Sequence, residues 1–203
     1  MHIVMIRHTL VGVPKGTCYG WSDVPVADTF EEEAAETKRN LEGTLSSITS
    51  HGHTIGFDAV FSSPLTRARK LAAYCGYANP ILDERLKEMN MGDWEMQRYD
   101  DINDDALQMW YEDYMHLRAT NGEGFPDLYA RVSSFFDDLL SHPEKITRNI
   151  ATPDRLDKVA IFAHGGVLIA AGIYFGLFPS EDCFSHLVPC GGLQVINTAP
   201  IVE

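Results

Sequence analysis

Short apolar runs alternate along the chain with longer segments in which apolar residues recur every three or four positions. A continuous apolar run of roughly four to eight residues is typical of a buried strand, whereas the longer spacing is typical of one helix face. On this pattern, strands are predicted over 2–7, 57–63, 80–83, 158–164 and 192–198.

Helices are predicted between these strands. The segment 29–48 carries Thr29 and Glu32 at the spacing of a capping box, followed by apolar residues at helical intervals. Further helices are predicted over 104–119, 127–140 and the apolar run 165–179.

The helix predicted over 63–76 has signals at both ends. Ser63 is expected as its N-cap and Pro64 as its first residue, and Gly76 follows its last turn. Strands that alternate with helices pair in parallel, with helices on both faces. We therefore expect an α/β fold, a three-layer sandwich around a mostly parallel sheet, as a single domain over 1–203.

Composition narrows the possible partners. The net charge of −13 argues against nucleic acid or an anionic membrane surface. The four cysteines form no C-x-x-C pair, so reduced thiols and a cytoplasmic location are expected. The N-terminus lacks the pattern of a signal peptide, and the run 165–179 is shorter than the roughly 20 residues that a membrane helix needs.

Polar residues that bind anions follow three of the predicted strands. The first strand ends at Arg7 and His8, another leads into a helix whose first turns hold Arg67, and a third ends at His164. Because parallel strands present their carboxyl ends at one edge of the sheet, these side chains are expected to converge there.

The types of these residues suit a phosphate. Arginine presents a planar fork to phosphate oxygens, and helix N-termini present free N–H groups. Taken singly, a histidine at a strand end is more often structural, and Arg67 would be a solvated helix residue. Their joint placement favours a phosphate cradle.

Four motifs then resemble, in order, those of the histidine phosphatase superfamily, also called phosphoglycerate mutase-like. They are R-H after the first strand, S-S-P-L-T-R-A with Arg67, L-K-E-M-N-M-G-D-W-E with Glu88, and A-H-G-G with His164. The R-H pair alone is a weak signal. The set is specific, and it spans most of the chain.

This resemblance implies a phosphoric monoester hydrolase that needs no metal or other cofactor. His8 would be the nucleophile that forms a phosphohistidine, and Glu88 would protonate the leaving alkoxide and later take a proton from water. Arg7, Arg67 and His164 would bind the phosphoryl oxygens of a small-molecule phosphate monoester.

The first motif departs from the commoner R-H-G-E because Thr9 follows the histidine. With the loop G-T-C-Y-G-W-S-D-V-P-V over 16–26, it is similar to the α-ribazole phosphatases of cobalamin biosynthesis. Those enzymes remove the 5′-phosphate from α-ribazole phosphate or from the assembled cobalamin phosphate. The loop also resembles that of phosphoglycerate mutases, so a mutase or a broad-specificity phosphatase is an alternative. Tyr19 is a candidate substrate-binding residue, and Cys18 is interpreted as a buried thiol.

Two further departures lie where the leaving group is expected. The family's W-E-G is W-E-M here, with Met96, and its G-E-S is G-E-G, with Gly124. Both changes concern the substrate more than the phosphoryl chemistry. The neighbouring Glu123 is either a substrate contact or a solvated loop carboxylate.

A lid insertion is expected at about 89–125. Its aromatic residues would suit a flat, benzimidazole-like leaving group, but for most of them an amphipathic helix that buries its own face is favoured. The segment is short and acidic, which favours a phosphatase over a mutase. Its large side chains include Trp94, Met109, Trp110, Tyr111 and Tyr114.

The sequence disfavours a binding domain without activity and a metal site. A non-catalytic phospholigand-binding domain is disfavoured because such a domain is expected to have lost His8 or Glu88. A metal site at His2, His51 and His53 lacks an acidic or cysteine partner at ligand spacing. The sequence does not indicate an oligomeric state.

Overall fold

The computed structural model describes residues 1–49, 56–147 and 156–198. His51 and His53 lie outside these residues. The strands are β1 (His2–Arg7), β2 (Ala59–Ser62), β3 (Ile81–Leu82), β4 (Lys158–Ala163) and β5 (Leu193–Asn197). The helices are α1 (Phe30–Ile48), α2 (Thr66–Tyr74), α3 (Asp105–Glu112), α4 (Phe125–Ser141), α5 (Pro143–Ile146) and α6 (Gly165–Tyr174). Short 3₁₀ helices span Glu84–Leu86, Gly92–Trp94, Tyr99–Asp101 and Ser180–His186.

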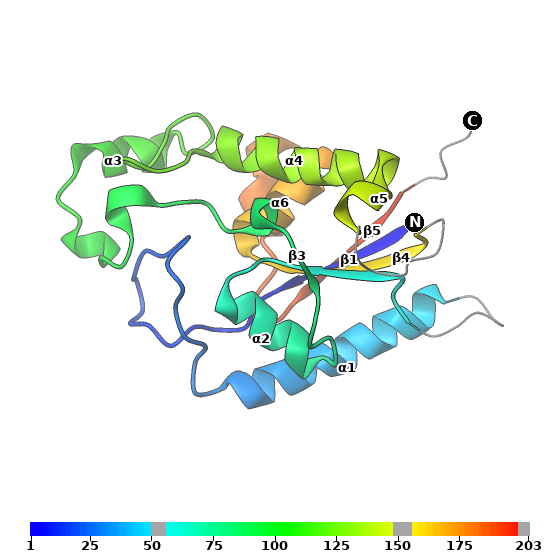
Figure 1. Ribbon diagram of the computed structural model, residues 1–203. Coiled ribbons are helices and arrows are strands. Elements are labelled where there is room, and N and C mark those ends of the chain that lie inside the picture. Colours follow the sequence, from blue (N-terminus) through cyan, green and yellow to red (C-terminus); the bar gives the residue numbers. More distant parts are fainter. Residues whose placement is uncertain (50–55, 148–155, 199–203) are drawn as a thin grey trace.

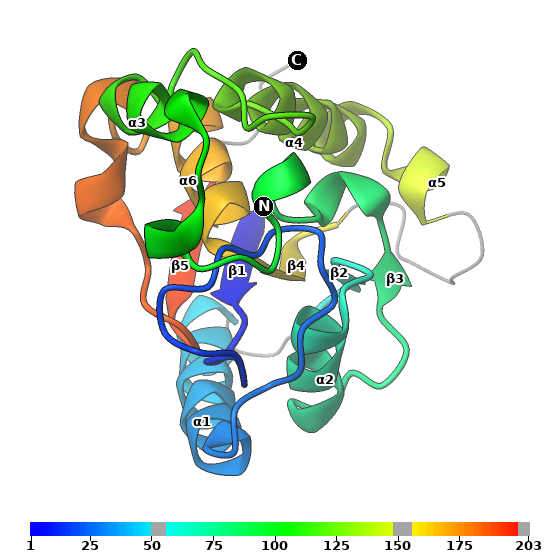
Figure 2. The same ribbon diagram turned by 90° about the vertical axis from the view of Figure 1, so that its left-hand side faces the viewer.

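One sheet of five strands forms the centre, in the order β3-β2-β4-β1-β5. The first four strands run parallel, and β5 pairs antiparallel with β1. Helices α1 and α2 cover one face, and α4, α5 and α6 lie on the other (Figures 1 and 2). The expected three-layer α/β sandwich is therefore confirmed.

The alternation of side chains along β1 explains the layers. Ile3 and Met5 pack with the buried residues of α4 and α6, whereas Val4 and Ile6 pack with those of α1 and α2. Successive strand residues point to opposite faces, and a strand covered on both faces therefore becomes a continuous apolar run.

The register of the sheet brings the strand ends to one level. Arg7, the last residue of β1, pairs with Ala163, the last residue of β4. His8 and His164 follow directly, so both leave the sheet side by side. The neighbouring strand β2 ends at Ser62, beside β4.

Helix α2 begins later than predicted. Thr66, not Pro64, is in its first turn, because Leu65 is extended and its N–H is bonded to the Ser63 hydroxyl. The first turn is capped by the distant Asp23, whose carboxylate accepts from the Thr66 N–H (2.8 Å) and hydroxyl (2.5 Å).

Helix α3 is shorter than the predicted 104–119. The chain leaves the helix after Glu112 and turns, and Arg118 then forms an antiparallel bridge with Gly124. The backbone near residue 118 pairs with the segment that precedes α4 and is therefore not available for a helix. The apolar spacing at 113–119 does not reveal this pairing.

Two smaller expectations were wrong. Thr29 is the N-cap of α1, but its side chain makes no capping bond and instead donates to Glu33, so the capping box with Glu32 is not formed. The apolar run 165–179 is helical only to Tyr174, since Gly176 adopts a left-handed φ of 66°.

The segment between Glu88 and α4 lies beyond the carboxyl edge of the sheet, with α3 at its far end (Figure 1). It packs around a small separate core, which its residues Met91, Trp94, Leu107 and Ala119 form together with Cys18 from the loop 16–26. Its role as a lid stays a prediction.

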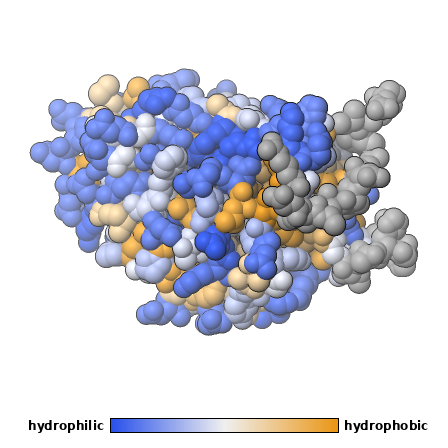
Figure 3. Space-filling view, in the orientation of Figure 1, coloured by the Kyte–Doolittle hydropathy of each residue, from blue (hydrophilic) through white to orange (hydrophobic). Residues whose placement is uncertain are grey.

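The molecular surface in the view of Figure 3 is mostly hydrophilic, with an apolar area near its centre. Among the described residues, no helix is both long enough and apolar enough to cross a membrane.

Candidate active site

His8 is buried at the end of β1 with one nitrogen fixed. Its Nδ1 lies 2.6 Å from the Thr9 carbonyl, and because a carbonyl only accepts, Nδ1 carries the proton. Burial, aided by the charges of Arg67 and Arg7, lowers the pKa of His8 from 6.5 to about 3. The imidazole is therefore neutral near pH 7, with a lone pair on Nε2.

His164 packs beside it, with ring centroids 5.2 Å apart. Its Nε2 and the Ser63 hydroxyl are hydrogen-bonded at 2.8 Å, and that hydroxyl also accepts from the Leu65 N–H. The other ring nitrogen of His164, Nδ1, is buried and has no partner among the described residues. Burial, followed by the charge of Arg67, keeps the pKa of His164 well below 6.5.

Two arginines bring positive charge to the same edge. Arg67 is fully buried and donates to the carbonyls of Ser22 (3.0 Å) and Gly20 (2.7 Å). Arg7 donates to the Val188 carbonyl (2.6 Å). Within the described chain, the buried Nε of each arginine has no partner. Buried polar groups are nearly always hydrogen-bonded, so these atoms indicate a site for an anion.

Glu88 enters from the loop that follows β3. Its Oε1 accepts from the Met89 N–H (2.9 Å) and its Oε2 from the Gly166 N–H in the first turn of α6 (3.1 Å). A side chain at position 166 would not fit, because an added Cβ would lie 2.4 Å from Oε1 of Glu88. The second glycine of the H-G-G motif is therefore required by the approach of this carboxylate.

A pocket of about 210 Å³ opens beside these groups. Arg7, Glu88 and Gly165 form its polar part. The remaining lining is largely apolar and comes from four regions of the chain. It includes Tyr19, Tyr99, Trp110, Tyr114, Phe125, Ile169, Phe184 and Leu187.

The large side chains of the 89–125 segment differ in whether they line the pocket, lie in the local core or are exposed. Trp110 and Tyr114 line the pocket, whereas Trp94 is buried in the local core. Met109 and Tyr111 are more than half exposed. Tyr19, predicted to bind substrate, lines the pocket and lies with its ring 5.3 Å from the Arg67 guanidinium.

Glu95 is a residue whose role was not predicted, although it stands in the W-E motif. It accepts N–H bonds from Gly20 (3.1 Å), Trp21 (2.7 Å), Ser22 (2.9 Å) and Met91 (3.0 Å). Burial alone would raise the pKa of Glu95, but these hydrogen bonds outweigh burial and lower it. Glu95 thus holds the N–H side of the loop whose carbonyls bind Arg67.

The structure explains the glycine at position 124 but not the methionine at position 96. Met96 has a left-handed φ of 63°, the conformation that glycine favours, and its side chain is exposed. Gly124 precedes α4 where an added Cβ would lie 2.7 Å from the Leu117 carbonyl. Glu123 is bonded to Arg131 and does not line the pocket, which favours a structural role over contact with substrate.

Among the described residues, no group of three or more His, Cys, Asp or Glu side chains could hold a metal ion. The positive charge that an anion would meet at this edge is supplied by the arginines.

The comparisons with known proteins agree with this geometry. Over 128 residues the chain is 32% identical to the adenosylcobalamin/alpha-ribazole phosphatase of Escherichia coli (strain K12), covering 49% of this chain and 60% of that protein. Over 163 residues it is 28% identical to the protein of the same name from Salmonella typhimurium, covering 71% and 75%.

A solved structure, the alpha-ribazole phosphatase from Shigella flexneri, superposes with a TM-score of 0.77 at 24% identity, over 98% of this chain and 92% of that one. That likeness supports the fold. The family model of the histidine phosphatase superfamily (branch 1) matches residues 3–198. The chain therefore belongs to the histidine phosphatase superfamily.

Proposed function

We propose that this protein is a metal-independent phosphomonoesterase that acts through a phosphohistidine at His8. The observation that carries the proposal is the neutral imidazole of His8 beside three buried nitrogen atoms that have no partner among the described residues. These atoms are Nε of Arg7, Nε of Arg67 and Nδ1 of His164. They fit the equatorial oxygens of a phosphoryl group in transfer.

The reaction would proceed in two displacements. Nε2 of His8 attacks phosphorus, and the ester P–O bond breaks as Glu88, protonated at this point, gives its proton to the leaving oxygen. Water then attacks the phosphohistidine, Glu88 takes a proton from it, and inorganic phosphate leaves with His8 restored. The two arginines stabilise the charge spread over the phosphoryl oxygens in both steps.

As substrate we propose α-ribazole 5′-phosphate, or the cobalamin phosphate that contains it. The aromatic lining next to Glu88 suits a leaving group with a flat aromatic base, and the names of the E. coli and S. typhimurium relatives point to the same compound. The 89–125 segment would act as a lid, because Trp110 and Tyr114 line the pocket from it.

The test is phosphate release from α-ribazole 5′-phosphate, 3-phosphoglycerate, several sugar phosphates and an aryl phosphate, without added metal. Wild type is compared with His8→Ala and with His116→Ala, a control at an exposed histidine. We expect α-ribazole phosphate to have the highest kcat/KM, His8→Ala to be inactive and His116→Ala to match wild type.

The intermediate can be trapped on the same samples. A labelled phosphoryl group bound to the wild-type chain should survive alkali and be lost in acid, as a phosphohistidine is. Equal turnover of all the esters would reduce the proposal to a broad-specificity phosphatase, and isomerisation of phosphoglycerate would favour a mutase. If wild type and His8→Ala were equally inert on every ester, a binding domain would be the better account.

A further inference from the structure

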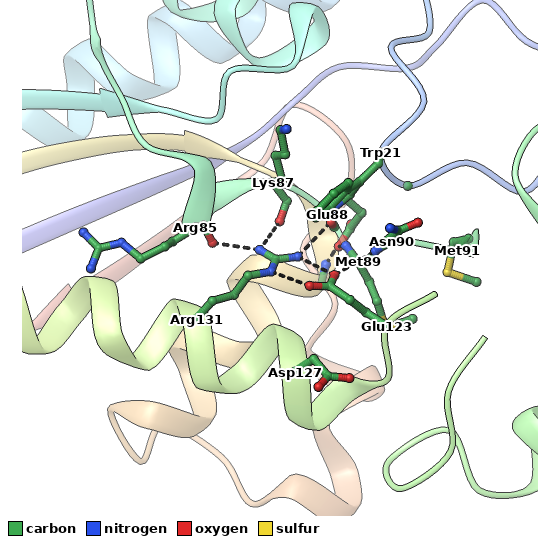
Figure 4. Close-up of polar contacts among 12 residues, drawn as sticks. Trp21, Arg85, Lys87, Glu88, Met89, Asn90, Met91, Glu123, Asp127 and Arg131 are labelled. Carbon is green, nitrogen blue, oxygen red and sulfur yellow. Dashed lines mark hydrogen bonds and ion pairs between the residues drawn. The ribbon is translucent and has the colours of Figure 1, made fainter. Parts of the chain in front are cut away.

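Arg131 on α4 lies directly behind the loop that carries Glu88 (Figure 4). Its Nη1 donates to the carbonyls of Arg85 (2.8 Å) and Lys87 (2.6 Å), and its Nη2 donates to the Glu88 carbonyl (2.8 Å). Nε and Nη2 also donate to the two carboxylate oxygens of Glu123, at 3.0 and 2.9 Å. These bonds use all five N–H groups of a guanidinium.

Glu123 binds the backbone on the C-terminal side of Glu88. While paired with Arg131, its Oε2 also accepts from the Asn90 N–H at 2.8 Å. The two side chains therefore bind three backbone carbonyls, those of residues 85, 87 and 88, and one backbone N–H, that of residue 90. Both are largely buried, at 16% and 17% exposure, and neither lines the pocket.

These contacts fix the position of the Glu88 carboxyl group. The carboxylate of Glu88 meets the Gly166 N–H on one side, and its backbone is held by Arg131 on the other. Proton transfer requires the acid within hydrogen-bond reach of the leaving oxygen, and a misplacement of about 1 Å can lower the rate about 100-fold.

We propose that Arg131, with Glu123, is a positioning residue for the acid–base step of this site, and that it acts by fixing the backbone of residues 85–90. The proposal rests on the proposed function, because it assigns the proton transfer to Glu88. It makes a specific claim about leaving groups. An alkoxide needs the proton of Glu88 as it departs, whereas an activated aryl oxide such as p-nitrophenolate departs without it.

The experiment compares kcat/KM for an alkyl phosphate and for p-nitrophenyl phosphate in wild type, Arg131→Met and Arg131→Lys. For each ester, kcat/KM depends only on the steps up to phosphoryl transfer to His8. The later hydrolysis of the phosphohistidine does not affect it. For Arg131→Met we expect a loss of about 10- to 100-fold with the alkyl ester and less than about 3-fold with the aryl ester. Lysine should restore part of the alkyl activity.

Arg85→Gln is the matched control. The Arg85 side chain also ties this loop to α4, through Asp138 and the Ser134 carbonyl, and it pairs with Asp83 in its own loop, but it does not bind the backbone around the acid. We expect this variant to lose stability and to keep the alkyl-to-aryl ratio of wild type. In a Glu88→Gln background, Arg131→Met should no longer change that ratio.

Equal losses on both esters, or the same change of ratio in Arg85→Gln, would overturn the positioning role. If Arg131→Met does not fold, Glu123→Gln takes its place, with a smaller change of ratio in the same direction expected. Failure of the proposed function is a separate result, since it would leave wild type no more active than His8→Ala on the aryl ester.

Discussion

Replacing Gly166 by alanine places a methyl carbon against the carboxylate of Glu88. An added Cβ would lie 2.4 Å from Oε1 of Glu88 and 2.9 Å from the Cδ2 atom of Leu128, both closer than real Cβ contacts. The leucine tip can rotate aside. The carboxylate must retreat by at least about half an ångström, which strains or breaks its bond from the Gly166 N–H.

The magnitude follows from that displacement. Moving a catalytic group by a fraction of an ångström to about 1 Å lowers rates by about 10- to 100-fold, or about 1.4 to 2.7 kcal/mol of transition-state stabilisation. Stability should change much less. Alanine is favoured over glycine in a helix by roughly 0.5–1 kcal/mol, which offsets part of the steric strain.

The assay is kcat/KM on an alkyl phosphate together with urea unfolding. Gly43→Ala is the control, because position 43 lies in α1 and an added Cβ there meets no atom within 4 Å. We expect the control to gain stability and keep full activity, and Gly166→Ala to keep its stability within about 1 kcal/mol. Full activity in Gly166→Ala would refute the close approach of Glu88 as the reason for this glycine.

Two further outcomes are expected. Between pH 6.5 and 5, His8 binds a proton in the unfolded but not the folded chain, because burial lowers its folded pKa to about 3, so wild type should lose roughly 1 to 2 kcal/mol more unfolding free energy than His8→Asn. Urea unfolding at both pH values measures this, with His116→Asn as an exposed control; equal losses would contradict it. Glu95→Gln should cost about 2 kcal/mol of stability and lower kcat/KM, because the loop 20–22 that it holds also orients Arg67. A loss of stability below about 0.5 kcal/mol in Glu95→Gln would contradict the proposed hold of Glu95 on this loop.

The sheet and its chemistry at the strand ends could be predicted because both follow from local rules. Apolar runs of strand length mark β1, β2 and β4, and the carboxyl ends of parallel strands share an edge. These rules predict that Arg7, His8, Arg67 and His164 lie together, and the structure brings them together.

The remaining features depend on contacts between distant residues. Asp23 caps α2 from more than 40 positions away in the chain, so the local signal at Ser63 gave the wrong start. Glu95 and Arg131 act on backbone groups, which carry no sequence signal at their own positions. The W-E motif was the available hint for Glu95. For Arg131 the sequence offers no hint, because only the structure places α4 beside the loop of Glu88.

The strand-end cluster of Arg7, His8, Arg67 and His164 and the aromatic wall of the pocket come from different parts of the fold, and this has an evolutionary consequence. The cluster is built on β1, β4 and the starts of α2 and α6, which the core fixes. The pocket takes most of its aromatic wall from the 89–125 segment and from residues 184–187, outside the sheet. Mutation can therefore remodel the wall without disturbing the cluster, because loops tolerate substitution and insertion far better than core strands. One inherited scaffold can in this way acquire new substrates while its chemistry stays the same.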